Sequence, residues 1–248
     1  MKKSSLLLSG LLLLLVTTPI FAEESSSSSA ESSSAASNEN ETKDEWADTI
    51  TLFTQMAKSI DEFYVTEGSV TAGIEEELKP GLYDVEVLKG DGYIRIKRNG
   101  NIKALYGSWS VAAPGNSKNS PSKVRLLLED KDQLEFNNIS KVKFIGVPEK
   151  IEQTNEFGIG EFFVNRDIKA GKYKLSTNLN LNPTFKGLGW KIDVYDVKTD
   201  RRYSQRLTPG NDDLVLNLKP FQTITIDLYN TDPNITPDDA RLIFTPVN

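Results

Sequence analysis

The side chains that most often carry chemistry in proteins are missing from this chain. Its 248 residues include no histidine and no cysteine. Catalysis by Ser-His-Asp or Cys-His arrangements is therefore excluded, and so is any metal site built on imidazole or thiolate ligands. No P-loop motif occurs, and no Gly-x-Gly-x-x-Gly opens a helix after a strand. The chemistry that remains belongs to carboxylates, amides and hydroxyls.

Carboxylates are plentiful, with 35 Asp and Glu residues in the chain. Two carboxylates on either side of a glycosidic bond are sufficient for glycoside hydrolysis. A secreted carbohydrate-active enzyme with paired carboxylates is therefore one alternative function. With so many acids, however, the meeting of two of them in space proves nothing. We predict no catalytic residues and a protein that is not an enzyme.

Oxygen ligands of the kind that calcium prefers gather near the C-terminus. They are Asp232, Asn234, Asp238 and Asp239, and their spacing is not that of an EF-hand. Asp and Asn are also favoured in turns, where their side chains bind nearby backbone groups. We expect no cofactor, and we keep these four residues as candidate metal ligands, with calcium as the ion that they suit.

Three aromatic residues lie close to expected loops. Tyr106 and Trp109 precede the Pro-Gly-Asn turn at 114–116, and Trp190 follows Gly-Leu-Gly at 187–189. Aromatic side chains at the loops of a β-sandwich can stack on sugar rings or anchor a protein partner. The same residue types also fill protein cores. Both roles stay open, and the three residues are our candidate ligand-binding residues.

The formal net charge of −6 comes mostly from one segment. Residues 23–45 hold seven acids and the single base Lys43, so the rest of the chain is close to neutral. A globular part without an excess of basic residues is a poor partner for nucleic acid. The expected partner is an extracellular protein or a cell-wall polysaccharide.

The N-terminus predicts export from the cytoplasm. Met1-Lys2-Lys3 is followed by an apolar stretch from Leu6 to Val16 and by Ala22, which are the three parts of a signal peptide. The stretch is short of the ~20 apolar residues of a membrane-spanning helix. We predict a signal peptide at 1–22, a mature protein without a transmembrane span, and a secreted location with association at the cell surface.

Two segments connect the signal to the folded part. Residues 23–43 are nearly all Ser, Ala, Glu and Asn, which predicts a disordered spacer. Residues 44–64 predict an amphipathic helix, because apolar residues recur every three or four positions. They are Trp46, Ile50, Phe53, Ala57, Ile60 and Tyr64. The apolar face either packs on the next domain of the chain or associates with a partner helix.

From Val65 onward the apolar period changes from 3.6 to 2. Short alternating runs such as Tyr93–Lys97 and Thr223–Leu228 are separated by Gly, Pro and Asn turns. This pattern is typical of antiparallel sheets with one buried face. We predict an all-β protein with two tandem, jelly-roll-like β-sandwich modules preceded by one amphipathic helix.

An internal repeat with an offset of 90 residues divides the β-rich part. The string around Gly81 and Tyr83 aligns with that around Gly171 and Tyr173, and the offset also pairs two later strands. We predict one module at 66–148 and a second at 149–248. The glycines are expected at positive φ in a turn that enters a strand beginning near the tyrosine.

The string Asp-Ile-Lys-Ala-Gly-Lys-Tyr at 167–173 resembles a known motif. Small all-β modules in secreted proteins of Gram-positive bacteria carry a similar Asp-Ile-x-Ala-Gly-x-Tyr turn. Residues 77–83 carry a more divergent version. The resemblance implies an all-β fold, an extracellular location and a Gram-positive source, but it supplies no active site.

Together these observations predict a non-enzymatic extracellular protein for binding or adhesion, or a surface accessory protein, built from two related β-modules. A structural spacer that positions the helix is the remaining alternative. A binding protein should show an exposed aromatic or apolar patch, an enzyme should show a deep cleft with paired acids, and a spacer should show neither.

Overall fold

The computed structural model describes residues 48, 50–66, 68–99, 107–230, 232 and 234–247. In this part the chain is all-β and sandwich-like, with one short helix in front, as predicted. The predicted signal peptide and spacer lie outside the described residues. Within the described residues, no helix has the length and apolar character needed to cross a membrane.

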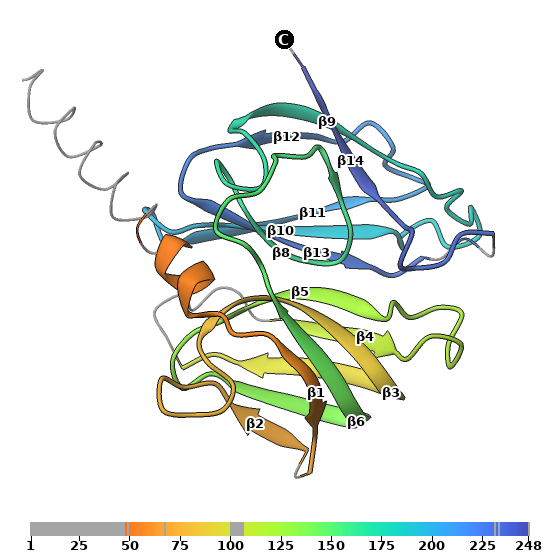
Figure 1. Ribbon diagram of the computed structural model, residues 1–248. Helices are drawn as coiled ribbons and strands as arrows, with labels where there is room; N and C mark the ends of the chain where they lie inside the picture. Colours follow the sequence, from red (N-terminus) through yellow and green to blue (C-terminus); the bar gives the residue numbers. More distant parts are fainter. Residues whose placement is uncertain are drawn as a thin grey trace, which may run out of the picture. The chain divides into compact units, whose positions relative to one another are not determined.

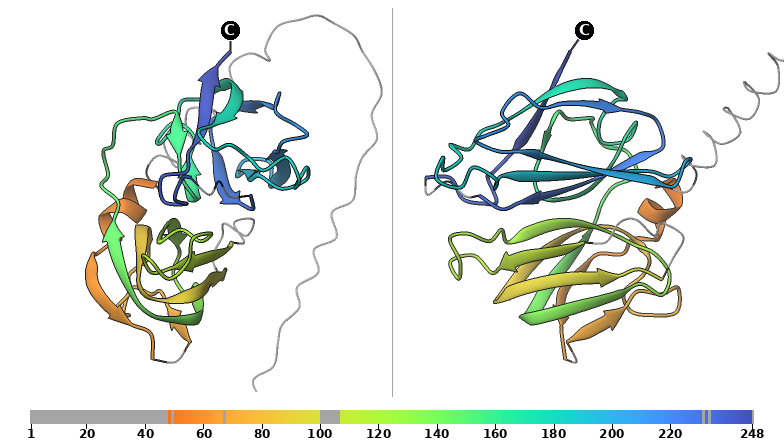
Figure 2. Two further views of the ribbon diagram at one scale, coloured as in Figure 1. Left: turned by 90° about the vertical axis from the view of Figure 1, so that its right-hand side faces the viewer. Right: turned by 180° about the vertical axis from the view of Figure 1, so that it is seen from behind.

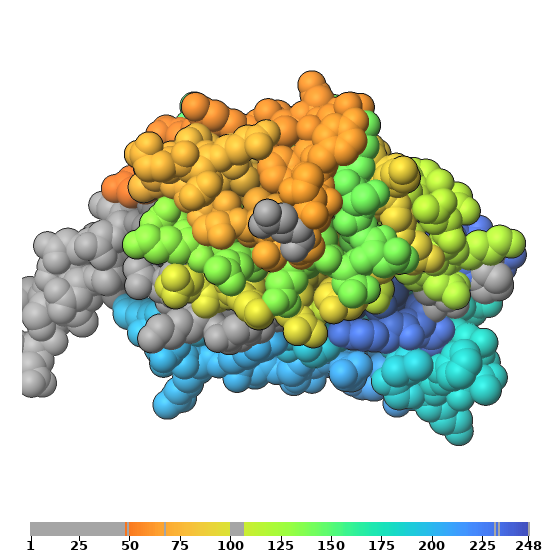
Figure 3. All heavy atoms as spheres, turned by 90° about the horizontal axis from the view of Figure 1, so that it is seen from below, coloured from red at the N-terminus to blue at the C-terminus, as the bar shows by residue number. Residues whose placement is uncertain are grey.

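Six strands form the first module. They are β1 (Ile60–Tyr64), β2 (Ser69–Thr71), β3 (Gly81–Lys97), β4 (Ser108–Ala112), β5 (Lys123–Leu128) and β6 (Gln133–Gly146). The long strands β3 and β6 pair with each other, and their register shifts between Val87 and Tyr93. Gly90 and Gly92 permit this shift, because a Cβ at either position would collide with the backbone of β6. In Figure 3, β1 and β2 (orange) lie against β6 (green) on one face of this module.

Eight shorter strands form the second module. They are β7 (Glu156–Phe157), β8 (Gly160–Phe163), β9 (Gly171–Thr177), β10 (Trp190–Asp196), β11 (Arg201–Leu207), β12 (Val215–Leu218), β13 (Gln222–Leu228) and β14 (Leu242–Pro246). Four of them make a separate sheet in the order β12-β9-β14-β7. The others, β8-β13-β10-β11, continue the sheet of the first module. Figures 1 and 2 show the two modules side by side within residues 48–247.

The same strand order recurs in both modules. In the first, one layer runs β5-β3-β6-β1 and the other runs β4-β3-β6-β2. In the second, the layers run β12-β9-β14-β7 and β11-β10-β13-β8. The difference is continuity, because β3 and β6 each serve both layers, whereas loops divide their counterparts into β9 and β10 and into β13 and β14.

Residue register follows the same offset of 90. Tyr83 pairs with Leu126 across β3 and β5, and Tyr173 pairs with Leu216 across β9 and β12. The hydroxyl of Tyr83 donates to the Lys79 carbonyl at 2.9 Å. The hydroxyl of Tyr173 donates to the Lys169 carbonyl at 2.8 Å. Each tyrosine therefore closes the turn that leads into its strand.

The predicted helix at 44–64 is wrong in its second half. The helix covers residues 50–56, and Ile60–Tyr64 form strand β1. Phe63 lies opposite Val142 and meets Phe144 edge to face, with 5.5 Å between ring centroids. The apolar residues of this segment also fit a helical period. As a strand, however, the segment pairs its backbone with β6 and buries Phe63 against Phe144 at the same time. The first module therefore begins at β1 rather than at residue 66.

The helix packs on its own chain. Ile50 is buried in a cluster with Leu82 and Leu127, and Phe53 packs against the same cluster. Just after the helix, Ala57 lies so close to β3 that a Cβ on Gly81 would be 2.6 Å from the Ala57 Cβ. Gly81 is thus required by close approach.

The prediction that Gly171 needs positive φ is wrong. Gly171 does not have positive φ. A Cβ added to it would lie 3.4 Å from the nearest atom of the Tyr173 side chain, which is an ordinary contact distance. The three atoms nearest to such a Cβ all belong to the Tyr173 side chain, so Gly171 has room for a Cβ.

The two modules share a buried boundary. β5 meets β8 through one parallel bridge, between Arg125 and Gly160. Gly160 has φ +137°, and a Cβ there would lie 2.5 Å from the Arg125 carbonyl oxygen. Beside this bridge an apolar cluster draws on both modules. Its buried members are Ile50, Leu82, Leu127, Val147, Phe163 and Tyr195.

A buried ion network crosses the same boundary. Arg98 of the first module donates to both carboxylate oxygens of Glu161 in β8, at 2.6 and 2.8 Å, and to Asp132 at 2.8 Å. All three side chains are at most 1% exposed. Burial would lower the pKa of Arg98, but the two carboxylates reverse this and raise it. The network thus joins the modules by charge as well as by apolar packing.

Candidate functional site

Two of the three aromatic residues predicted from sequence as ligand contacts belong to the core. Trp109 is 1% exposed and Trp190 is 0% exposed. The indole N–H of Trp190 donates to Thr177 Oγ1 at 2.8 Å, so its polar atom is satisfied inside the protein. Both side chains face the interior because they occupy inward positions on their strands. Tyr106 lies outside the described residues.

The candidate metal ligands near the C-terminus hold the protein together instead. Asp238 accepts from Ser122 N and Ser122 Oγ, both at 2.7 Å, and so connects the modules. Asp232 accepts from the backbone of Asn234 and Asn180, and these hydrogen bonds lower its pKa.

The other two candidates make local contacts. The Asn234 amide donates to Asp232, and Asp239 accepts from the Thr236 hydroxyl at 2.6 Å. Across the part of the chain that the structure describes, no three acidic side chains gather as a metal site.

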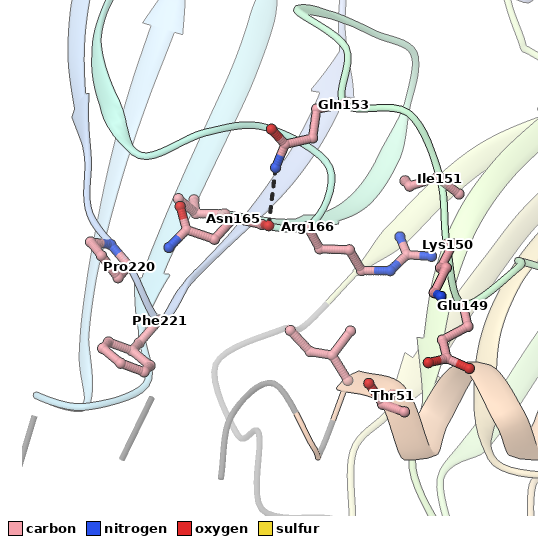
Figure 4. Close-up of a pocket in the computed structure, with 11 residues that line it drawn as sticks. Thr51, Glu149, Lys150, Ile151, Gln153, Asn165, Arg166, Pro220 and Phe221 are labelled. Carbon is pink, nitrogen blue, oxygen red and sulfur yellow. Dashed lines mark hydrogen bonds between the residues drawn. The ribbon is translucent and has the colours of Figure 1, made fainter. Parts of the chain in front are cut away.

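A cleft of about 590 Å³ opens where the helix, the linker between the modules and the second module meet (Figure 4). Three kinds of segment line it, namely the helix start, the linker and two turns of the second module. The lining residues are Ile50, Thr51, Glu149, Lys150, Ile151, Gln153, Val164, Asn165, Arg166, Pro220 and Phe221. The walls are mostly apolar, with a few polar groups. This combination is typical of small-ligand and side-chain pockets.

Arg166 is the charged residue most deeply set in this cleft. Its side chain is 9% exposed. Nη1 donates to Asp167 Oδ1 and Nη2 donates to the Pro148 carbonyl, each at 2.7 Å. Nε is buried and has no hydrogen-bond partner. Burial lowers the pKa of Arg166; Asp167 opposes the shift, and the charge of Arg125 adds to it.

Leaving a buried donor unsatisfied is unfavourable, by about 1–3 kcal/mol. Because Nε is itself buried, an acceptor oxygen in the cleft would meet the two Nη groups, each of which carries a second N–H beyond the one bonded to Asp167 or to the Pro148 carbonyl. Figure 4 shows the side chain extending from its turn toward Lys150 of the linker. The structure therefore places two cationic groups and the exposed carboxylate of Glu149 beside apolar walls, and the buried cation among them suits a ligand with an apolar body and an acceptor.

The two turns that shape the cleft are held rigidly. Asn165 has φ +72°, a conformation that Asn tolerates well. Its backbone N–H donates to Ile168 at 2.6 Å, and its carbonyl accepts from Gln153 Nε2 at 3.0 Å, the dashed line in Figure 4. The second turn contains Phe221, which has φ +66°. A bulky residue in this region is strained by roughly 1–3 kcal/mol.

The buried acids at the boundary form no free carboxylate pair. Asp167 accepts from Arg166, from Arg125 at 3.2 Å and from the backbone N–H of Phe163 at 2.7 Å. Glu161 accepts from Arg98 and from Leu127 N at 2.7 Å. Burial raises the pKa of both acids, and the arginines oppose that rise. These carboxylates are already hydrogen-bonded to arginines and backbone N–H groups at the boundary between the modules.

The cleft residues were not among the sequence candidates. Arg166 stands directly before the Asp-Ile-Lys-Ala-Gly motif, but nothing in that string shows a guanidinium with an unpartnered nitrogen. Phe221 follows a proline in a turn, and Ile50 is 171 residues away from it in the chain. Only the packing of the modules brings them together.

No protein-family model, curated protein or solved structure matches the chain. The proposals below therefore rest on the sequence and the geometry.

Proposed function

We propose that this chain is a non-enzymatic extracellular binding protein, held at or near the cell surface, and that the cleft of Figure 4 receives part of a protein partner. The observation that carries the proposal is Arg166, a largely buried guanidinium at the wall of the cleft, whose two Nη groups each keep one N–H for an acceptor beside apolar surface. The matching ligand is a peptide segment with an apolar side chain and a carbonyl or carboxylate oxygen.

Three further features support this function. The N-terminal residues have the pattern of a signal peptide, and a spacer rich in Ser and Glu follows it. The strand order and tyrosine contacts are those expected of two copies of one module, as in the secreted Gram-positive modules that the 167–173 string resembles. The buried acids Glu161 and Asp167 are bound by arginines, which does not favour the alternative of a glycosidase.

The turn containing Phe221 allows a sharp test. Phe221→Gly removes one wall of the cleft and suits the φ of +66°, so the fold should be kept. Lys131→Gly is the matched control, because Lys131 has φ +68° in the corresponding turn of the first module, away from the cleft.

The chain from residue 23 onward would be screened against displayed random short peptides. We expect enriched peptides that combine an apolar and an acidic residue, that bind the Lys131→Gly protein normally and that lose binding to the Phe221→Gly protein. The proposal fails if no peptide is enriched, or if the enriched peptides bind both variants equally.

A further inference from the structure

The second module has an open groove on its described surface. It lies between β11 and β12, the end strands of the two layers, and has a volume of about 420 Å³. The groove is separate from the cleft of Figure 4 and shares no lining residue with it.

The groove exists because the inward positions of β11 carry polar residues. Tyr203 pairs with Val194 and Gln205 pairs with Ile192, and both partners on β10 face the core. Side chains of paired residues lie on the same face of a sheet. Tyr203 and Gln205 therefore point into the sandwich, yet both are exposed.

In the first module, the position that corresponds to the groove is filled by a buried side chain. Phe136 pairs with Ile94, and Ile94 pairs with Trp109 of β4. In the second module, Ile226 pairs with Ile192, which pairs with Gln205. Gln205 therefore holds the position of Trp109, which is 1% exposed and fills the interior. The second module has a polar groove where its counterpart has a tryptophan.

The charges along the groove favour an acidic ligand. Arg201 and Lys219 line it, and neither forms a salt bridge with any described residue. The one acid in the lining, Asp196, accepts from Thr199 N at 3.0 Å and from Gln222 Nε2 at 3.2 Å. The groove thus offers two cations against one hydrogen-bonded carboxylate.

The remaining groups suit a sugar. Tyr203 is 36% exposed, and a partly exposed ring at the wall of a groove can stack on a pyranose face. Burial raises the pKa of Tyr203, so its hydroxyl stays protonated as a donor. The amides of Gln205 and Asn217 supply both donors and acceptors for sugar hydroxyls.

We propose that this groove binds an acidic polysaccharide. Tyr203 stacks on a sugar ring, Arg201 and Lys219 contact the acidic groups, and Gln205 and Asn217 bind hydroxyls. This site goes beyond the peptide-binding cleft and does not depend on it.

The test measures binding of the chain from residue 23 onward to three polymers by affinity electrophoresis. Polygalacturonate carries carboxylates, dextran sulfate carries sulfate esters, and dextran is neutral. We expect binding to one or both acidic polymers and none to dextran. The polymer that binds more tightly shows which acidic group is preferred. Failure to bind either acidic polymer, or equal binding to dextran, would overturn the proposal.

Three variants locate the binding. Arg201→Gln should weaken it about tenfold, the effect of losing one charged contact. Arg206→Gln is the matched control, since it makes the same charge change on the opposite face of the same strand, where Arg206 covers the Tyr229 ring. Gln205→Trp should abolish binding by filling the groove as Trp109 does. Equal losses in both arginine variants would mean non-specific attraction and would refute the groove.

The Phe221→Gly variant separates the two proposals. It should leave polysaccharide binding unchanged, because Phe221 does not line the groove. Loss of polysaccharide binding in Phe221→Gly would count against a groove that acts independently of the cleft.

Discussion

The turn after β5 in the first module and the turn after β12 in the second have the same backbone conformation and the same local hydrogen bond. Lys131 has φ +68° and Phe221 has φ +66° at corresponding positions. Asp132 accepts from Glu129 N, and Gln222 accepts from Lys219 N, each at 2.9 Å. Backbone and local hydrogen bonding are thus kept across the two modules.

The modules differ in the second contact that Asp132 and Gln222 make. Asp132 binds Arg98, and that pair is buried at the boundary with Glu161. Gln222 instead donates to Asp196, which lines the open groove of the second module. The same turn conformation therefore supports a buried ion network in the first module, called the ionic junction below, and a polar groove in the second. Similar backbones thus leave their side chains free either to hold the modules together or to bind a ligand.

The largest expected effect follows from the ionic junction. Arg98→Ala would leave Asp132 and Glu161 buried without a countercharge, which costs about 3–5 kcal/mol of unfolding free energy. The corresponding change in the second module, Asp196→Ala, removes two hydrogen bonds at a groove open to water and should cost about 1 kcal/mol or less. Urea unfolding followed by tryptophan fluorescence measures both.

Adding Glu161→Gln to Arg98→Ala should restore part of the loss, because one unpaired charge is then removed. Equal costs for Arg98→Ala and Asp196→Ala would show that the junction is not held by its ions.

The motif glycines give the next comparison. Gly81→Ala would place a Cβ 2.6 Å from that of Ala57 and should destabilise the protein by about 1–3 kcal/mol. Gly171→Ala meets nothing closer than 3.4 Å and has no positive φ, so its effect should stay within about 0.5 kcal/mol. Thermal unfolding of the two single variants decides this. A larger loss for Gly171→Ala would contradict the role given to Ala57.

Sequence alone predicts the sheet content and the register of the repeat, because alternation and turn residues are local signals. Val142-Lys143-Phe144 aligns with Leu242-Ile243-Phe244 once an insertion near residues 232–239 is allowed for, and the pairing agrees, since Phe144 faces Val85 and Phe244 faces Leu175. The alternation of apolar residues in a core strand is kept even where the loop before it differs in length.

Three features could not be read from sequence, each for a physical reason. Ile60–Tyr64 fits both a helical period and a strand, and the choice depends on pairing with β6. The tryptophans fill the core because inward or outward facing is fixed by register. Arg98 and Glu161 lie 63 residues apart, so their contact depends entirely on how the modules pack.

The smallest effects concern the two turn-closing tyrosines. Tyr173→Phe removes one hydrogen bond, to Lys169, at a cost of about 1 kcal/mol. Tyr83→Phe should cost more, because the Tyr83 hydroxyl also accepts from the backbone N–H of Lys58 at 3.1 Å. That donor would be left without its partner in a partly buried place. Urea unfolding at neutral pH compares the two variants.

The same pair predicts the response to alkaline pH. Burial raises the pKa of Tyr83 and of Tyr173 above the ordinary value of 10. Each tyrosine then contributes stability that is fully present below pH 10, and it is lost as the pH rises through the folded-state pKa, because the unfolded chain ionises first. Between the wild type and either Phe variant, the difference in unfolding free energy should therefore shrink above pH 10. A difference that stays constant up to pH 11.5 or grows there would show that the hydroxyls ionise as readily in the folded protein as in the unfolded chain.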